Sequence, residues 1–460
     1  MEVAGKKVLV MGAGRSGIAC AKFLADRGAI VALNDQKAIE KWSPEALALK
    51  GQGVGCLPGE MPGWLLDHSE LLVVSPGVPT KSIPVRYAER AGVEIIGEVE
   101  LASRFLKGRI VAITGTNGKT TTTSLIGEML KDAELPAQVG GNIGTPLISL
   151  VESSRDDGWT VVELSSFQLE TIKEFHPTVA LVLNITPNHM DRYESFTDYA
   201  AAKRRIFENQ TSDDVAVLNM DDEIVASWAS GLRAFVAKFS VQRELDIGLF
   251  LRGREIVVRS PEAERVLMLR DEMKLRGLHN VENVLGALTV GLACGVSAQS
   301  MLETIKRFEP VEHRLERVAE IEGVQFYNDS KATSVDATMK ALEAFKEDFG
   351  QVVLILGGRG KNAPYAPLGP LVKEKVRQLI LIGEDSERIA NELGEFAPTQ
   401  KAVDLKDGVN RSFQVAQPLD IVLLAPACAS FDMFESFEHR GQVFKQEVQS
   451  LKSKVQGLAS

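Results

Sequence analysis

The sequence predicts an α/β protein of three domains. Short apolar runs alternate with segments of helical periodicity along almost the whole chain, which is typical of parallel sheets covered by helices. Two of the apolar runs end in a glycine-rich turn that opens a helix, at Gly12–Gly17 and at Gly115–Thr121. A length of 460 residues is enough for about two to four domains. We place the three domains at residues 1–97, 98–309 and 310–460.

Composition excludes several classes of protein. Hydrophobic residues make up 45% of the chain and charged residues 25%, so it can bury sizeable cores, and its net charge of −10 argues against a nucleic-acid or membrane-surface binder. No run approaches the roughly 18 apolar residues of a membrane span, and the N-terminus enters a strand without a signal-peptide core. The four scattered cysteines favour reduced thiols over disulfides or a thiolate metal site. We expect a cytoplasmic protein without nucleic-acid partners or membrane insertion.

The first domain is predicted to be Rossmann-like. Its turn Gly12–Gly17 fits the pattern G-x-G-x-x-G after a strand, and Asp35 follows the second strand. This is the pattern of a dinucleotide site, so a nicotinamide-dependent oxidoreductase is one hypothesis. The same geometry holds any diphosphate at a helix N-terminus, and a purely structural turn is a further alternative. The predicted elements are strand Lys7–Met11, a helix over about Ser16–Arg27, and strands Ile30–Asn34 and Leu71–Ser75.

The second domain is predicted to be P-loop ATPase-like. Strand Ile110–Thr114 leads into Gly115–Thr121, where converging backbone N–H groups can hold phosphates, Lys119 can reach the outer phosphates and Thr120 can bind Mg²⁺. Ile113 stands where the full motif has its first glycine, so the loop is a shortened variant. Glu163 ends the next strand and can hold the metal beside the loop. Further strands are predicted at Thr160–Leu164, Val179–Ile185 and Asp214–Asn219, a small antiparallel sheet at 233–276, and a helix at Asn280–Ala293.

The third domain is again predicted to be Rossmann-like, with no long linker before it. Its predicted strands are Val324–Tyr327, Val352–Leu356, Leu379–Ile382 and Ile421–Leu424. Pro310 interrupts the chain at the start of this domain, which predicts a hinge near Phe308–His313.

The shortened phosphate loop resembles that of the Mur ligase superfamily. Further stretches resemble the branch of that superfamily that adds D-glutamate to UDP-N-acetylmuramoyl-L-alanine, and they follow one another through all three domains. These stretches are Gly12–Gly17, Gly140–Gly144, Glu163–Leu169, Asn188–Tyr193, Asn328–Thr333 and Ala425–Ser430. The resemblance implies that ATP phosphorylates the substrate carboxylate and that the amine of D-glutamate attacks the acyl phosphate. It also implies a monomer that works in peptidoglycan precursor synthesis with ATP and two Mg²⁺ ions, and without NAD.

The resemblance also implies which residues form the site. Lys119, Glu163, His189 and Lys203 are the implied catalytic residues, and Thr120, Glu163, His189 and Lys203 the metal ligands, with Lys203 carbamylated by CO₂. ATP is expected at Gly115, Thr116, Asn117, Gly118, Lys119, Thr120, Thr121, Asn280, Arg314 and Asp329. The UDP substrate is expected at Gly14, Arg15, Ser16, Asp35, Gln36, Lys37, Gly77, Asn142 and His189. D-glutamate is expected at Lys331, Thr333, Lys361, Ser430 and Phe437.

Three hypotheses therefore stand beside one another. A D-glutamate-adding ligase accounts for both glycine-rich turns. An oxidoreductase accounts for Gly12–Gly17 and Asp35 but leaves the Gly115 loop unexplained. A non-catalytic nucleotide-binding module does not need Glu163 and His189 as metal ligands.

Overall fold

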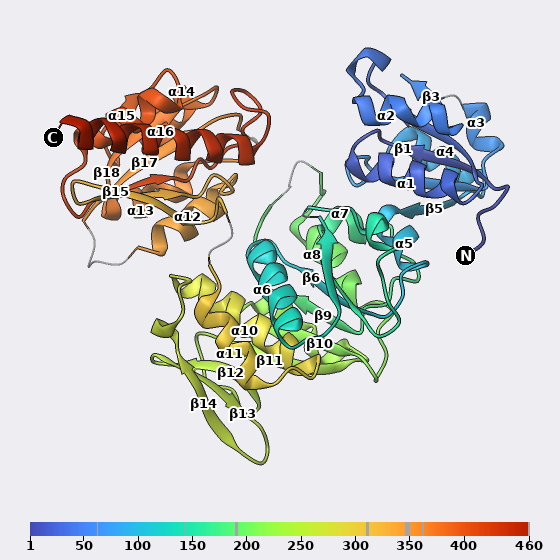
Figure 1. Ribbon diagram of the computed structural model, residues 1–460, viewed down its shortest axis with the longest axis horizontal. Helices are drawn as coiled ribbons and strands as arrows, with labels where there is room; N and C mark the ends of the chain where they lie inside the picture. Colours follow the sequence, from blue (N-terminus) through green and yellow to red (C-terminus); the bar gives the residue numbers. More distant parts are fainter. Residues whose placement is uncertain are drawn as a thin grey trace. The chain divides into compact units, whose positions relative to one another are not determined.

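Three β-sheets organise the chain in the computed structural model (Figure 1). The structure describes residues 1–458 except 62, 143, 189–191, 310–311, 346–349 and 361–362. Two compact units are present, one of Met1–Met273 with Glu282–Arg307 and one of Lys274–Val281 with Phe308–Ser460. The predicted α/β class is confirmed, whereas the domain boundaries after residues 97 and 309 stay predictions. No helix in the part of the chain that is described is long and apolar enough to cross a membrane.

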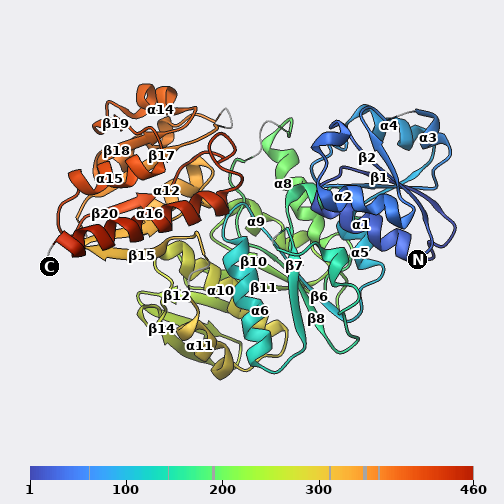
Figure 2. The same cartoon turned by 45° about the horizontal axis from the view of Figure 1, so that its top comes forward.

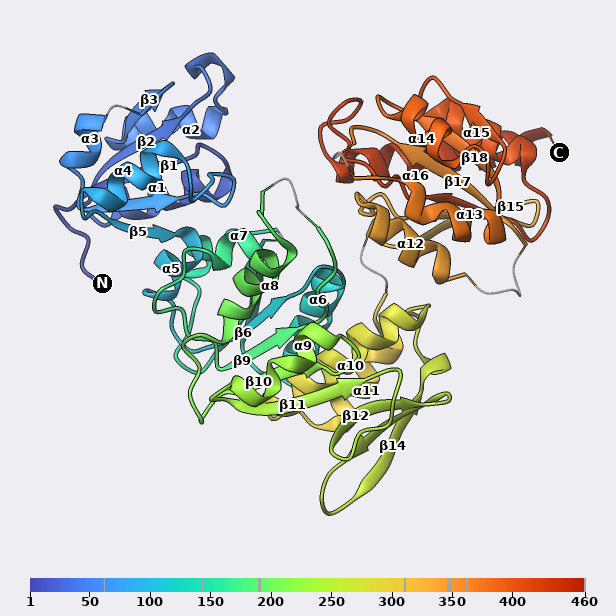
Figure 3. The ribbon, with the colours of Figure 1, turned by 180° about the vertical axis from the view of Figure 1, so that it is seen from behind.

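Within the described part of the N-terminal domain, the sheet has five parallel strands in the order β3-β2-β1-β4-β5. Val8 and Val10 pack on the face covered by α1, and Leu9 and Met11 on the face covered by α3 and α4 (Figure 3). Burial on both faces explains why these strands read as continuous apolar runs. The elements are β1 (Lys7–Met11), α1 (Arg15–Asp26), β2 (Ile30–Asp35), α2 (Pro44–Ala48), β3 (Gly55–Pro58), α3 (Gly63–Asp67), β4 (Leu71–Val74), α4 (Ile83–Arg90) and β5 (Glu94–Gly97).

The central sheet has nine strands among the described residues, in the order β14-β13-β12-β11-β10-β9-β6-β8-β7. The strands from β7 to β12 are parallel, and β12, β13 and β14 are antiparallel. The predicted antiparallel strands are therefore present, but they continue the parallel sheet because Phe239 of β11 pairs with Leu249 of β12. The strands are β6 (Arg109–Thr114), β7 (Ala137–Gly141), β8 (Trp159–Glu163), β9 (Val179–Val182), β10 (Val215–Asn219), β11 (Phe235–Ser240), β12 (Gly248–Arg252), β13 (Glu255–Arg259) and β14 (Glu264–Leu269).

Strand β6 marks the point where the order of this sheet reverses. The chain runs from β6 through helix α6 to β7 and β8 on one side, and then crosses to β9 on the other. Ligands of open α/β sheets bind at the carboxyl ends of the strands beside such a point. The helices are α5 (Glu98–Ser103), α6 (Lys119–Asp132), α7 (Ser166–Leu169), α8 (Phe196–Arg204), α9 (Glu223–Ser227), α10 (Leu278–Ala293) and α11 (Ala298–Arg307), and α6 and α11 lie side by side (Figure 2).

The C-terminal sheet has six strands among the described residues, in the order β15-β16-β20-β17-β18-β19, of which β15 alone runs antiparallel to its neighbour. Leu354 and Leu356 of β17 pack toward α12 and α13, and Val353 and Ile355 toward α15 and α16. The elements are β15 (Glu316–Ile321), β16 (Val324–Asn328), α12 (Val335–Glu343), β17 (Val352–Gly357), α13 (Gly369–Lys375), β18 (Val376–Ile382), α14 (Ser386–Leu393), β19 (Thr399–Lys401), α15 (Leu405–Val415), β20 (Ile421–Leu424) and α16 (Phe437–Leu458).

Candidate active site

The loop Gly115–Thr121 joins β6 to α6 at the reversal point of the central sheet. Gly118 caps the helix with a φ of 80°, and a Cβ at this position would lie 2.0 Å from Asn283 Oδ1. Only glycine fits here, because the backbone is left-handed and the space is taken. Asn184, just after β9, holds the loop by accepting the backbone N–H of Thr116 on its carbonyl at 2.8 Å and that of Asn117 on Oδ1 at 2.9 Å.

Two lysines converge on the same loop. Lys119 Nζ donates to the carbonyl oxygens of Gly115 at 2.9 Å and Thr116 at 2.8 Å. Lys203 comes from α8, is buried, and donates from Nζ to the carbonyl oxygen of Gly115 at 2.8 Å. Burial lowers the pKa of Lys203 well below its usual value, the charge of Lys119 lowers it further, and Glu163 opposes the shift. The amine of Lys203 is thereby driven toward its neutral, nucleophilic form.

Glu163 connects the phosphate loop to the end of β7. Its Oε2 accepts the Thr120 hydroxyl at 2.9 Å and its Oε1 accepts Asn142 Nδ2 at 2.9 Å. The carboxylate is buried and reaches the loop because Glu163 lies opposite Ile113 of β6 in the sheet. A hydroxyl and a carboxylate oxygen in contact are hard oxygen donors, and this donor set suits Mg²⁺. Thr120 and Glu163, both predicted as metal ligands, therefore lie in direct contact, and their binding of Mg²⁺ stays a prediction.

His189 lies outside the described residues. Arg192 and Tyr193, close behind it in the sequence, join the two sheets of this unit. Arg192 Nη1 donates to the carbonyl oxygen of Pro76 at 2.9 Å, and its guanidinium lies 3.8 Å from the ring centroid of Phe167. The Tyr193 hydroxyl donates to Glu170 Oε1 at 2.6 Å. The turn after β4 is thus fixed against the central domain.

The predicted UDP-binding residues of the first domain gather at one edge of its sheet. They follow β1, β2 and β4, which are neighbours, so Gly14–Ser16, Asp35–Lys37 and Gly77 all lie at carboxyl ends of adjacent strands. Asp35 organises this edge, because its Oδ2 accepts the backbone N–H of Ala13 at 2.8 Å and its Oδ1 that of Lys37 at 2.9 Å. Gly14 caps α1 without a side-chain bond, so the backbone N–H groups of this helix start suit a phosphate. Asn142 belongs to the central sheet instead.

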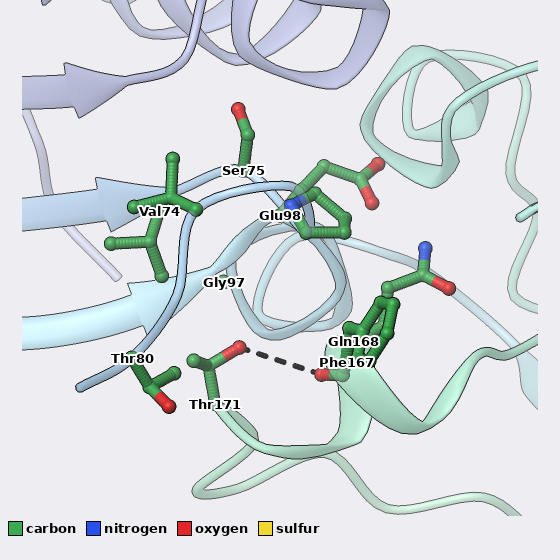
Figure 4. A pocket seen from close by; sticks show the side chains of 10 residues that line it. Val74, Ser75, Thr80, Gly97, Glu98, Phe167, Gln168 and Thr171 are labelled. Carbon is green, nitrogen blue, oxygen red and sulfur yellow. Dashed lines mark hydrogen bonds between the residues drawn. The ribbon is translucent and has the colours of Figure 1, made fainter. Parts of the chain in front are cut away.

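A small pocket lies where the turn after β4 meets α7 (Figure 4). Its volume of about 10 Å³ has room for roughly one water molecule, so the turn and the helix pack closely against each other here. Glu98 stands at its wall, with Oε1 accepting the backbone N–H of Ile148 at 2.8 Å. Burial raises the pKa of Glu98 to about 7.

The predicted amino-acid-binding residues lie at the carboxyl ends of β16 and β20 and at the start of α16. Lys331 Nζ lies 4.1 Å from the ring centroid of Phe437, and Thr333 is two residues farther along the same loop. Ser430 is buried in the loop after β20. Lys361 lies outside the described residues.

Arg440 of α16 connects the loop after β16 to the loop after β20 through hydrogen bonds. Its Nε donates to Ser330 Oγ at 2.9 Å, its Nη2 to the carbonyl oxygen of Ser330 at 2.9 Å, and its Nη1 to that of Cys428 at 3.2 Å. The side chain is fully buried, and burial lowers the pKa of this guanidinium to about 10.

The predicted ATP contacts outside the phosphate loop lie in the C-terminal unit. Asn280 Nδ2 donates to the carbonyl oxygen of Arg276 at 2.7 Å. Burial raises the pKa of Asp329 to about 7, and the charge of Arg314 opposes the shift, which puts these two groups near each other. The roles of Asn280, Arg314 and Asp329 toward a nucleotide stay predictions.

Sequence reasoning missed three residues that shape these sites: Asn184, Tyr199 and Arg440. Tyr199 is buried on α8 and its hydroxyl lies 3.0 Å from Thr116 Oγ1. A polar residue directly after a buried strand could have indicated Asn184, since carboxyl ends of parallel strands meet. No comparable signal marks Arg440.

Comparisons with known proteins cover nearly the whole chain. Residues 6–97 match the model of the Mur ligase MurD-like N-terminal domain, residues 113–291 that of the Mur ligase middle domain, and residues 313–428 that of the Mur ligase glutamate ligase domain. The UDP-N-acetylmuramoylalanine–D-glutamate ligase of Acidobacterium capsulatum is 49% identical over 97% of this chain and 96% of its own. The protein of the same name from Solibacter usitatus is 47% identical over 99% and 100%.

Solved structures share the fold at lower identity. A pseudomurein peptide ligase type C from Methanothermus fervidus has a TM-score of 0.63 at 16% identity, and covers 97% of this chain and 100% of its own. The MurF ligase from Thermotoga maritima, solved in complex with ADP, has a TM-score of 0.61 at 16% identity, with 98% and 96% covered.

Proposed function

This chain belongs to the Mur ligase family, and we propose that it is the ATP-dependent ligase that joins D-glutamate to UDP-N-acetylmuramoyl-L-alanine in peptidoglycan precursor synthesis. The observation that carries the proposal is the phosphate loop bonded through Thr120 to Glu163, in a chain 49% identical over nearly its full length to a ligase of that name. Under this proposal Gly12–Gly17 holds the diphosphate of UDP, because ATP is already held by the Gly115 loop.

The reaction depends on neutralising the charges of the reactants more than on covalent catalysis by the protein. A substrate carboxylate oxygen attacks the γ-phosphorus of ATP, ADP leaves, and the amine of D-glutamate then displaces phosphate from the acyl carbon. Two anions must meet in the first step, and the backbone N–H groups of the loop together with Lys119 offset their repulsion. Mg²⁺, held by Thr120 and Glu163, would add positive charge at the same phosphates. For a second Mg²⁺ we propose His189 and Lys203.

Lys203 is suited to the modification that the proposal gives it. A neutral amine attacks CO₂, forms a C–N bond and releases one proton, which leaves a carbamate with a negative charge. Burial and the charge of Lys119 both favour the neutral amine. The resulting carbamate would supply oxygen donors to a metal and a counter-charge to Lys119.

The remaining substrate sites are assigned to residues at the carboxyl ends of strands. We propose that UDP binds at the carboxyl edge of β1, β2 and β4, that Asn142 contacts the muramoyl part, and that D-glutamate binds beside Lys331, Thr333, Lys361, Ser430 and Phe437. We further propose a monomer in the cytoplasm. The four free cysteines fit such a reducing compartment.

Phosphate release from ATP tests the proposal. Purified protein is given ATP, Mg²⁺ and UDP-N-acetylmuramoyl-L-alanine, and D-glutamate is compared with L-glutamate, D-aspartate and L-alanine. We expect release above background with D-glutamate only, and a product whose mass is one glutamyl residue larger. Equal release with every amino acid, or none, would refute it. Oxidation of NADH or NADPH in the same mixture would instead favour the oxidoreductase hypothesis.

A further inference from the structure

A buried tyrosine connects three loops at the carboxyl edge of the C-terminal sheet. Tyr365 lies between β17 and α13 and is 2% exposed. Its hydroxyl lies 2.8 Å from Asp385 Oδ2, in the loop after β18, and 2.9 Å from Cys428 Sγ, in the loop after β20. Since β20, β17 and β18 are neighbours in the sheet, one hydroxyl bridges the exits of three adjacent strands.

The donor of each of these two hydrogen bonds can be assigned. A phenol has one proton, and the Asp385 carboxylate accepts it. The Cys428 thiol therefore donates to the phenolic oxygen, so the order runs from thiol to phenol to carboxylate. Burial raises the pKa of Cys428 to about 11, which keeps the thiol protonated and able to donate.

The loop after β20 needs such support because its backbone is strained. Ala427 has a φ of 58°, a left-handed conformation that is costly for an alanine. Its backbone N–H donates to the carbonyl oxygen of Ala332 at 2.9 Å. Ala429 exchanges two backbone hydrogen bonds of 2.9 Å with Arg359, in the loop after β17. Tyr365 thus fixes the side chain of Cys428 in a loop whose backbone bonds to both neighbouring loops.

Ser430 lies two residues after Cys428 in this loop. We propose that Tyr365 is a positioning residue for the amino-acid site, and that its hydroxyl sets the place of Ser430 by holding Cys428 against Asp385. The inference rests on the proposed function, because it takes Ser430 as part of a D-glutamate site. It adds a buried residue that lies outside the stretches singled out in the sequence.

Tyr365→Phe removes the hydroxyl and keeps the ring. We expect the KM for D-glutamate to rise about three- to ten-fold, the effect of one or two lost hydrogen bonds, while the KM values for ATP and UDP-N-acetylmuramoyl-L-alanine stay within about two-fold. Tyr327→Phe is the matched control, since that hydroxyl donates to Gln325 Oε1 at 3.1 Å in the same unit. It should leave all three KM values unchanged.

A second pair of variants tests the same contact if Tyr365→Phe does not fold. Cys428→Ser keeps a donor for the phenolic oxygen and should retain a D-glutamate KM near that of wild type, whereas Cys428→Ala should raise it as Tyr365→Phe does. The double variant Tyr365→Phe/Cys428→Ala should raise the D-glutamate KM little more than either single change does. An equal rise in all three KM values, or a D-glutamate KM unchanged in both Tyr365→Phe and Cys428→Ala, would overturn the positioning role. Wild-type protein that releases no phosphate with D-glutamate would instead overturn the proposed function.

Discussion

Lys119 and Lys203 share one acceptor, because their Nζ atoms lie 2.9 and 2.8 Å from the carbonyl oxygen of Gly115. Two ammonium groups on one carbonyl repel each other, and the repulsion is relieved when one of them is neutral. Lys203 is the buried one, and its pKa is lowered well below the usual value by burial first and by Lys119 second. The Gly115 carbonyl therefore accepts from two lysines, and Lys203 is the one whose pKa is shifted toward the neutral amine.

Lys203→Ala should lower the rate of product formation by about 100-fold or more, the scale of losing a charged group at a reaction centre. Acetate or formate in the millimolar range should restore part of it, because a free carboxylate can replace the carbamate oxygens. The measurement is the initial rate of phosphate release with increasing acid. Lys238→Ala, an exposed lysine of the same sheet, is the control and should respond to neither change. Full activity of Lys203→Ala without any acid would exclude the carbamate.

Lys119→Ala should abolish product formation and leave binding of UDP-N-acetylmuramoyl-L-alanine intact. The reason is that Lys119 belongs to the phosphate loop of the central sheet, whereas the predicted UDP residues follow strands of the N-terminal sheet. Isothermal titration calorimetry of the nucleotide substrate, beside an activity assay, separates the two effects. Loss of that binding would mean that the two glycine-rich turns do not serve separate nucleotides.

Gly118→Ala should damage ATP use more than its backbone strain alone explains. Gly118 and Gly53 have φ values of 80° and 82°, but a Cβ at Gly118 would lie 2.0 Å from Asn283 Oδ1 and one at Gly53 would meet nothing within 4 Å. Gly53→Ala thus shows the cost of strain alone, about 1 kcal/mol. We expect Gly118→Ala to raise the KM for ATP at least about ten-fold and Gly53→Ala to leave it unchanged. Equal effects of the two changes would show that the clash is relieved at no cost.

Glu98→Gln should change how stability depends on pH. The pKa of Glu98 is raised from 4.5 to about 7 by burial, so the folded protein favours the neutral acid. As pH rises from about 4.5 to 7, the unfolded chain loses this proton before the folded one does, and the wild type should lose about 3 kcal/mol of stability from this group. Above pH 7 the loss is complete. A glutamine has no proton to lose, so this slope should vanish.

Urea unfolding followed at pH 5, 6, 7 and 8 checks the prediction. The difference in midpoint between Glu98→Gln and wild type should move in favour of the variant as the pH increases. Glu60→Gln, which alters an exposed carboxyl of the same domain, should run parallel to wild type. A parallel curve for Glu98→Gln as well would mean that Glu98 is already ionised at pH 5.

Much of the architecture could be predicted because buried parallel strands appear in the sequence as continuous apolar runs. Such runs predict strands at Ile110–Thr114 and Ile421–Leu424, and the structure has strands at Arg109–Thr114 and Ile421–Leu424. The two edge strands of the C-terminal sheet, β15 and β19, are not predicted, since they lack that signal. Glu316–Ile321 contains three charged residues among its six, and Thr399–Lys401 is only three residues long.

The residues of the candidate site also include some that the sequence predicts and some that it does not. Thr120 and Glu163 could be paired from the sequence because one follows a phosphate loop and the other ends the next strand. Asn184 carries a weaker signal, because a polar residue after a buried strand indicates a sheet edge, whereas its place beside the phosphate loop depends on the strand order β9-β6-β8. Arg440 reads as an ordinary exposed cation of a polar helix, and its burial depends on carbonyl groups of Ser330 and Cys428 in distant loops.

The edge of the central sheet that carries β12, β13 and β14 offers a practical use. Three strands, β11, β10 and β9, stand between β12 and the phosphate-loop strand β6. The turn that joins β12 to β13 contains Gly253 with a φ of 59° and open space around it. A fluorophore or a surface tether attached at this turn would label or immobilise the enzyme four strands away from the phosphate-loop strand. The ribbon is therefore the natural handle for single-molecule and biosensor work on this ligase.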